Sequence, residues 1–229
     1  MNASSCDTIL FDLDGTLIDS ISGLIASFEY LVEKYPEFGT VDRAIIRNHV
    51  GRPFFDLWLK MTGDEARATD LLEEFRQHNR QTIPNLVLFS GCREMLSELR
   101  QRGFKVGLVT SKGKVSTLLR LSAHNLEQNF DVVLAKEDTE FHKPRPEPLL
   151  QAIGLLKSEA RATAYVGDTV YDIEAAQAAG CMSVAALWGA HDREAVLTTS
   201  PHLLCEVVSD LLEAFVSPSI AVVAPRCSG

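Results

Sequence analysis

Short runs of apolar residues alternate along the chain with longer segments that have helical periodicity. Five of these runs have the length and composition of strands, and they cover residues 8–11, 105–109, 130–134, 162–166 and 182–186. The runs are apolar almost throughout and show no polar alternation, so we expect the strands to be buried on both faces. Strands of this kind, joined by helices, are typical of a parallel sheet with right-handed crossovers.

Helical segments with one apolar face are available to cover this sheet. Residues 91–102 carry Met95, Leu96 and Leu99 on one face, and a second helical stripe ends at Gly180. The second stripe consists of Val170, Ile173, Ala176 and Ala179. The sequence therefore predicts an α/β fold, with a Rossmann-like parallel sheet core and helices on both faces.

The segment between the first two strands is far longer than one crossover helix requires. It is predicted to form four helices, over residues 22–34, 41–50, 53–61 and 64–81, because Pro36, Gly51, Pro53 and Pro84 stand at helix boundaries. We therefore expect an inserted helical cap domain. The predicted division is an α/β core of residues 1–16 and 87–216, a cap of residues 17–86, and a loosely held tail of residues 217–229.

The composition is that of an ordinary globular protein with one large domain, or one domain with an insertion. The 229 residues are 46% hydrophobic, and 22 Lys and Arg against 31 Asp and Glu give a formal charge of −9. An acidic chain without a basic cluster is a poor partner for nucleic acid. The apolar runs are too short to span a membrane and no secretory signal is present, so we predict no membrane contact and a cytoplasmic location. The five scattered cysteines are expected to be reduced thiols.

Two pairs of carboxylates follow predicted strands. Asp12 and Asp14 stand directly after the first strand, and Asp168 and Asp172 lie four residues apart at the start of a helix. Each pair alone has an ordinary interpretation, a solvated Asp-Gly turn for the first and helix capping for the second. A calcium loop of the EF-hand kind is excluded for the first pair, because the glycine and glutamate that it requires are missing from positions 17 and 23.

Two further polar segments also follow strands. Thr110 and Ser111 come directly after the strand that ends at residue 109, and His142-Lys143-Pro144 lies in the loop after the strand that ends at residue 134. The carboxyl ends of parallel strands face one crevice, so we expect all these groups to meet there. Crowded carboxylates need a cation, and oxygen ligands suit a hard ion such as Mg²⁺. A lysine and hydroxyls beside that ion would suit the oxygens of a phosphoryl group.

The order and content of these four segments resemble the motifs of the haloacid dehalogenase superfamily, in its phosphatase branch with a small helical cap. Asp12-Leu13-Asp14-Gly15-Thr16-Leu17 resembles the first motif, and Gly167-Asp168-Thr169-Val170-Tyr171-Asp172 resembles the fourth. Thr110 corresponds to the second motif and Lys143 to the third. The similarity is strongest to phosphoglycolate phosphatases and related pyrophosphatases, although Arg145 stands where those proteins commonly have an acidic residue.

The resemblance implies a role for each motif residue. Asp12 would attack phosphorus and form an aspartyl-phosphate, and Asp14 would protonate the leaving oxygen and then activate water. Mg²⁺ would be held by Asp12, the backbone carbonyl of Asp14 and Asp168, with Asp172 supporting the site from outside the metal's own ligands. The phosphoryl oxygens would be held by three residues that follow strands: Thr110, Ser111 and Lys143.

The resemblance leaves the substrate and several alternatives open. Asp14 favours hydrolysis of a small phosphorylated metabolite, a phosphate monoester of the phosphoglycolate kind, or alternatively of pyrophosphate or a nucleotide. A sugar-phosphate mutase of the β-phosphoglucomutase kind and a non-catalytic phospholigand-binding protein are further alternatives. Arg52, between two cap helices, and Lys112 are candidates for contacts with an anionic leaving group. The chain is expected to be a monomer or a homodimer.

Overall fold

Six parallel strands form the central sheet of the computed structural model, which describes residues 3–40, 42–49, 54–189 and 192–216. In chain order the strands are β1 (Thr8–Phe11), β4 (Lys105–Val109), β5 (Val132–Leu134), β6 (Thr163–Gly167), β7 (Met182–Ala186) and β8 (Leu203–Cys205). Their order in the sheet is β5-β4-β1-β6-β7-β8, so β1 lies in the interior between β4 and β6. The predicted α/β fold with a parallel sheet is confirmed.

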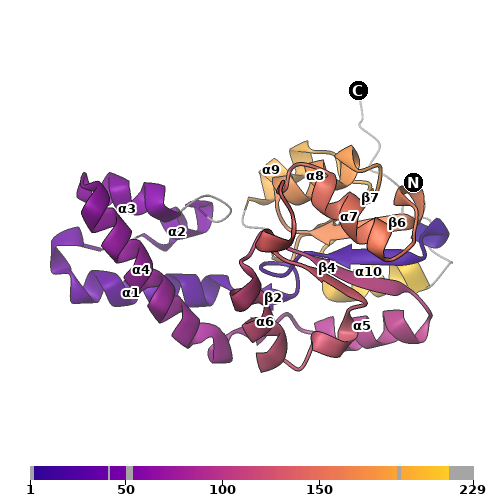
Figure 1. Ribbon diagram of the computed structural model, residues 1–229, viewed down its shortest axis with the longest axis horizontal. Coiled ribbons are helices and arrows are strands. Elements are labelled where there is room, and N and C mark those ends of the chain that lie inside the picture. The colour runs from indigo at the N-terminus through magenta and orange to yellow at the C-terminus, as the bar shows by residue number, and fades with distance from the viewer. Residues whose placement is uncertain (1–2, 41, 50–53, 190–191, 217–229) are drawn as a thin grey trace.

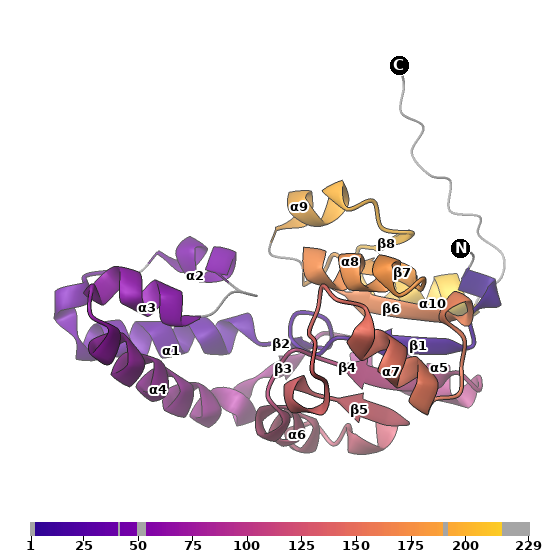
Figure 2. The same cartoon turned by 45° about the horizontal axis from the view of Figure 1, so that its top comes forward.

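Helices cover both faces of this sheet (Figures 1 and 2). They are α5 (Cys92–Gln101), α6 (Lys114–Ala123), α7 (Glu147–Leu155), α8 (Val170–Ala178), α9 (Arg193–Thr198) and α10 (Val208–Val216). Alternate side chains of β1 serve the two faces: Ile9 and Phe11 share a hydrophobic cluster with α5 and α10, and Leu10 shares one with α7 and α8. Burial on both faces explains why the strands show no polar alternation in the sequence.

Four helices between β1 and β4 form the insertion: α1 (Ile21–Lys34), α2 (Arg43–His49), α3 (Phe54–Thr62) and α4 (Glu65–Thr82). They lie beside the sheet rather than on either of its faces (Figure 1), and they have a hydrophobic cluster of their own. Its centre is aromatic, because the rings of Phe28 and Trp58 stack with centroids 4.6 Å apart and the ring of Phe75 lies 4.8 Å from that of Phe28. These rings belong to α1, α3 and α4, so they hold three helices together.

A short antiparallel ribbon joins the insertion to the sheet. It consists of β2 (Ile18–Asp19) and β3 (Val87–Leu88). Four residues near the ends of the predicted cap segment are buried in the cluster of the sheet instead of the cluster of the insertion: Leu17, Ile18, Ile83 and Leu86. The division at residues 17 and 86 stays a prediction, and the separate helical core lies inside those limits, with buried members from Ile25 to Phe75.

The sequence pattern misses the shortest elements. β2 and β3 have two residues each, which is too few for a strand pattern to be recognised, and β8, with three residues, was not predicted either. Short 3-10 turns complete the described chain at Ala3–Ser5, Pro36–Phe38, Ile83–Asn85, Glu127–Asn129, Lys136–Asp138 and Ala160–Ala162. The predicted tail, residues 217–229, lies outside the described residues. Among the helices that the structure describes, none is long and apolar enough to cross a membrane.

Candidate active site

The segments that follow β1, β4 and β6 meet at the carboxyl edge of the sheet. Phe11, the last residue of β1, is in register with Leu108 of β4 and Val166 of β6. The next residue, Asp12, donates its backbone N–H to the carbonyl oxygen of Val166 at 2.9 Å, which continues the parallel pairing beyond the strand. The topology therefore brings together strand ends that the sequence predicts to meet.

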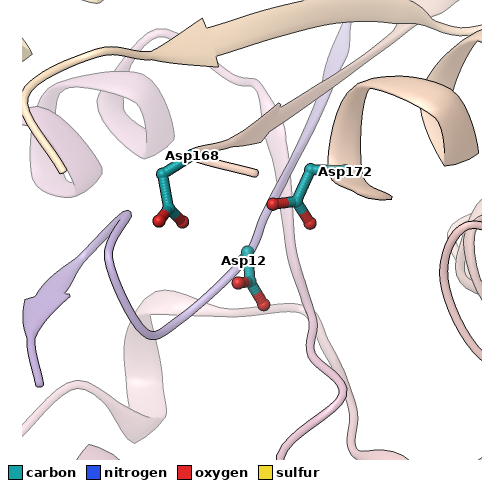
Figure 3. A group of neighbouring side chains, drawn as sticks. All are labelled: Asp12, Asp168 and Asp172. Atoms are coloured by element: carbon teal, nitrogen blue, oxygen red, sulfur yellow. The ribbon is translucent and has the colours of Figure 1, made fainter. Parts of the chain in front are cut away.

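Asp12, Asp168 and Asp172 form a buried cluster of carboxylates at this edge. They come from the loop after β1, the end of β6 and the start of α8 (Figure 3). One carboxylate oxygen of each lies within 4.8 Å of the others, and the residues are 7%, 1% and 0% exposed. Burial raises the pKa of Asp12 to about 6 against the opposing charge of Lys143, and the charge of Asp172 adds to the rise. Burial likewise raises the pKa of Asp168 well above its ordinary value, with Asp172 and Asp12 adding to it.

This cluster has the chemistry of a divalent-cation site. Buried carboxylates that lie close together repel one another, and a cation among them removes that cost. Carboxylate oxygens are hard ligands of the kind that Mg²⁺ and Ca²⁺ prefer. The three aspartates can therefore hold a metal ion. The carboxylate of Asp14 is not part of the cluster, and the resemblance assigns only the backbone carbonyl of that residue to the metal.

Two glycines make room for the carboxylates. Gly15 has a φ of +82°, which favours glycine, and a Cβ at this position would overlap the carboxylate of Asp168. A Cβ at Gly167 would overlap the side chain of Asp172. From the same turn, the buried hydroxyl of Thr16 donates a 3.0 Å hydrogen bond to Oδ1 of Asp168. The turn after β1 therefore contributes to the site. It is not the solvated Asp-Gly turn that the sequence left open as an alternative, because Asp12 and Thr16 are buried.

Lys143 is buried against the carboxylate cluster, with 6% of its side chain exposed. Its Nζ lies 2.9 Å from Oδ1 of Asp12, and it donates to Oδ1 of Asp172 at 2.6 Å and to the hydroxyl of Tyr165 at 2.9 Å. Burial alone would lower the pKa of Lys143, but Asp12 and Asp172 keep it well above its ordinary value. The ammonium group is thus charged, and it donates hydrogen bonds to Asp172 and Tyr165 while forming an ion pair with Asp12.

Asp172 and Tyr165 hold Lys143 in place. Oδ2 of Asp172 accepts hydrogen bonds from the backbone N–H of Thr169 at 2.9 Å and from the Thr169 hydroxyl at 2.6 Å, so this carboxylate also caps α8. Helix capping and contact with Lys143 therefore coexist. The sequence analysis missed Tyr165, whose hydroxyl donates to the carbonyl oxygen of Val109 at 2.8 Å. A tyrosine inside an apolar strand was the available signal, because a buried hydroxyl requires a partner.

Asp14 is paired with two cations outside the carboxylate cluster. Nζ of Lys112 lies 2.7 Å from Oδ2 of Asp14, and Nε of Arg120 lies 3.5 Å from Oδ1. Burial would raise the pKa of Asp14, but Lys112, Arg120 and a hydrogen bond from Ser20 outweigh it, so the pKa lies below its ordinary value. Lys112 was predicted to contact the substrate, and in this structure its ammonium group forms an ion pair with Asp14. Arg120 was not predicted, and its isolated charge among the leucines of α6 was the signal.

Thr110, Ser111 and Lys143 line a small pocket together. The other residues of its wall are Val109, Leu134, Ala135, Thr139, His142 and Pro148. Thr110 is 6% exposed, whereas Ser111 is exposed to solvent. The residues predicted to hold phosphoryl oxygens are thus neighbours in space. Arg52, the other predicted substrate contact, lies outside the described residues.

Comparison with known proteins gives a family and several relatives. The sequence model of the haloacid dehalogenase-like hydrolases matches residues 9–186. The pyrophosphatase PpaX of Bacillus pumilus is 34% identical over 213 residues, which are 93% of this chain and 97% of that protein.

Solved structures of similar shape cover nearly the whole chain. A "predicted phosphoglycolate phosphatase" from Haemophilus somnus superposes with a TM-score of 0.82 and 22% identity, covering 91% of this chain and 97% of that one. A haloacid dehalogenase-like hydrolase from Streptococcus pneumoniae superposes with a TM-score of 0.80 and 22% identity, covering 92% and 99%. At these identities the structures support the fold alone.

Proposed function

The chain belongs to the haloacid dehalogenase-like hydrolase family, and we propose that it is a phosphatase whose nucleophile is Asp12. The family prediction from the four motifs is confirmed. The chain is therefore a hydrolase, and its relatives with phosphatase names support the phosphatase class. One observation carries the proposal: Asp12 is buried at the end of β1, within the carboxylate cluster and 2.9 Å from the ammonium group of Lys143.

The proposed reaction has two steps. In the first, a carboxylate oxygen of Asp12 attacks phosphorus, the bond from phosphorus to the leaving oxygen breaks, and Asp14 in its protonated form gives its proton to that oxygen. Lys112 and Arg120 lower the pKa of Asp14, and Lys112 would relieve this effect by turning from Asp14 to the anionic substrate. In the second step, Asp14 takes a proton from water, and the water oxygen attacks the phosphorus of the aspartyl-phosphate. The bond from phosphorus to the Asp12 oxygen breaks, which releases phosphate and restores the Asp12 carboxylate. Lys143 favours the ionised form of Asp12, which opposes the effect of burial on its pKa. Thr110, Ser111 and Lys143 would donate hydrogen bonds to the phosphoryl oxygens.

We propose that the metal is Mg²⁺, held by the carboxylates of Asp12 and Asp168 and by the backbone carbonyl of Asp14. Both oxygens of Asp172 already accept hydrogen bonds from Lys143 and Thr169, which supports an indirect role for this residue. When bound, the ion would neutralise negative charge on the carboxylates and on the phosphoryl group.

We propose a small phosphorylated metabolite as the substrate, a phosphate monoester of the phosphoglycolate kind. Pyrophosphate is a second candidate, because the relatives that are 34% identical are named pyrophosphatases. Lys112 also favours it: this half-buried cation lies 2.7 Å from Asp14, the residue proposed to meet the leaving oxygen, and it would stabilise a leaving phosphate. Arg52 stays a proposed contact with the same leaving group.

We further propose that the helical segment of residues 17–86 acts as a cap that excludes water from the site. A cytoplasmic location is supported by Cys92, Cys181 and Cys205, which are free buried thiols.

The test is phosphate release from a panel of phosphoglycolate, pyrophosphate, sugar phosphates, nucleotides and an aryl phosphate, with Mg²⁺ or EDTA. We expect release with Mg²⁺, none with EDTA, and a loss of at least about 10³-fold in Asp12→Asn, because the amide is no nucleophile. Asp7→Asn is the matched control, since Asp7 precedes β1 at its opposite end and contacts Thr8 and Ser158.

Three outcomes would contradict the proposal. An active Asp12→Asn would exclude Asp12 as the nucleophile. Return of the phosphoryl group to a sugar, with dependence on a bisphosphate, would indicate the mutase. Ligand binding without turnover of any compound would indicate a phospholigand-binding protein.

A further inference from the structure

Arg120 is a buried arginine in a helix whose exposed side is apolar. Its side chain is 1% exposed, while Leu118 and Leu119 of the same helix are 47% and 46% exposed. Packing alone favours the opposite arrangement, with leucines inside and the charge in water. A local exception of this kind is expected where a residue serves the site rather than the fold.

Arg120 makes polar contacts in three directions. Its Nε lies 3.5 Å from Oδ1 of Asp14, and within the part of the chain that the structure describes this is the carboxylate that compensates its charge. Its Nη1 donates to the carbonyl oxygen of Ser116 at 3.2 Å and also to the Ser116 hydroxyl, which anchors the guanidinium on its own helix. Its Nη2 donates to Oδ1 of Asn79 at 3.4 Å. Since the fork of donors is rigid, fixing two nitrogens fixes the third.

Asn79 belongs to the helical insertion, near the end of α4. Its Nδ2 donates to the hydroxyl of Ser27 in α1 at 3.4 Å, and that hydroxyl donates to the carbonyl oxygen of Gly23 at 2.7 Å. A continuous chain of polar contacts therefore runs from Asp14 through Arg120 and Asn79 to α1. It links Asp14, the proposed acid and base, to α1 and α4, the first and last helices of the insertion.

We propose that Arg120 is a positioning residue that orients the carboxylate of Asp14 toward the leaving oxygen, and that Asn79 fixes Arg120 from the insertion. The two cations on Asp14 differ in this respect. Lys112 holds Oδ2 from a loop and has 21% of its side chain exposed, so it can exchange between Asp14 and an anionic substrate. Arg120 holds Oδ1 from the interior and cannot reach solvent. This inference rests on the proposed function, because it assigns Asp14 to proton transfer.

The test compares leaving groups in the full-length enzyme with Mg²⁺. An alkyl phosphate needs a proton on its leaving oxygen, whereas p-nitrophenyl phosphate releases a stable anion and needs none. In Arg120→Met, which keeps the length but removes the charge, we expect kcat/KM for the alkyl ester to fall at least about 30-fold, mainly in kcat, and that for the aryl ester less than about 3-fold. Arg120→Lys should recover part of the loss.

Two further variants separate positioning from folding. Asn79→Ala removes the contact from the insertion and should lower the alkyl rate about 3-fold while leaving the aryl rate unchanged. In an Asp14→Asn background, Arg120→Met should cause no additional loss with the alkyl ester, since its effect passes through Asp14. Arg100→Met is the control, because Arg100 forms a surface ion pair with Asp131 at 2.8 Å, away from the site.

Equal losses with both esters, or additive losses with Asp14→Asn, would overturn the inference. If Arg120→Met does not fold, Arg120→Lys and Asn79→Ala decide, and the absence of discrimination between leaving groups in both would overturn it. A wild-type enzyme that is inactive on every phosphate would instead refute the proposed function, and the inference with it. An active wild type with undiscriminating variants refutes the inference alone.

Discussion

The sheet and the helical insertion differ in what they bury. The region of the sheet and its covering helices buries charged groups among its apolar side chains, including Asp12, Asp168, Asp172 and Arg120. The insertion is built around stacked aromatic rings, and among its described side chains no charged residue is buried. Its ion pairs lie at the surface, as for Lys34 with Glu74, and such pairs contribute little to stability.

This difference indicates that the chemical groups belong to the sheet region and that the insertion is held together by ordinary packing. A buried charge is costly unless a nearby group of opposite charge compensates it. At the carboxyl edge of the sheet, Lys143 compensates Asp12 and Asp172 in this way. The insertion has an ordinary hydrophobic core and can act on the chemistry through the few polar contacts that it makes with the sheet. The contact between Asn79 and Arg120 is one of them.

The largest effect is expected from breaking the aromatic core of the insertion. Trp58→Ala should lower the free energy of unfolding of the insertion by about 3–5 kcal/mol, because Trp58 is fully buried and stacked on Phe28. Met95→Ala, in a fully buried position of α5, is the counterpart in the sheet and should cost about 2–5 kcal/mol there. Calorimetry should show two transitions, each lowered by one variant. A single transition lowered by both would mean that the two regions unfold as one unit.

A second effect concerns the turn that forms the carboxylate site. Gly15→Ala places a methyl group against Asp168 at a φ of +82°, so we expect activity to fall at least about 100-fold, or about 2.7 kcal/mol. Gly39→Ala is the matched control in the insertion, because Gly39 also has a positive φ, +68°, but has open space around it. It should destabilise the protein by about 1 kcal/mol and leave kcat unchanged. Equal losses of activity in both variants would contradict the role given to the turn.

The smallest effect is a pH dependence of stability without metal. Folding raises the pKa of Asp12 from 3.8 to about 6, so the folded state binds more protons than the unfolded state between these values. The contribution of Asp12 to stability is present below about pH 4 and is lost as the pH rises through about 6. In EDTA, the unfolding free energy of wild type relative to Asp12→Asn should therefore fall by about 1–3 kcal/mol across this range, as measured by urea denaturation. A constant difference would show that Asp12 is not destabilised by burial.

The sequence by itself determined the elements that depend on local pattern. Runs of apolar residues identify β1, β4 and β6, because strands covered on both faces need no polar side chains. Asp12 and Asp168 could then be placed at one edge, since parallel strands end on the same side of a sheet. The four helices of the insertion were recognisable from proline and glycine at their limits, whereas the two-residue strands that join it to the sheet were too short to be recognised.

Only the tertiary structure decided which groups touch across long distances in sequence. In the sequence, Tyr165 is one residue of an apolar strand. In the structure its hydroxyl accepts a hydrogen bond from Lys143 and donates one to the carbonyl oxygen of Val109. In the sequence, Arg120 is an isolated charge on a helix. In the structure it contacts Asp14 in the turn after β1 and Asn79 near the end of α4. The physical reason is that a local pattern specifies whether a side chain is buried, but the partner that compensates a buried charge depends on how distant elements pack.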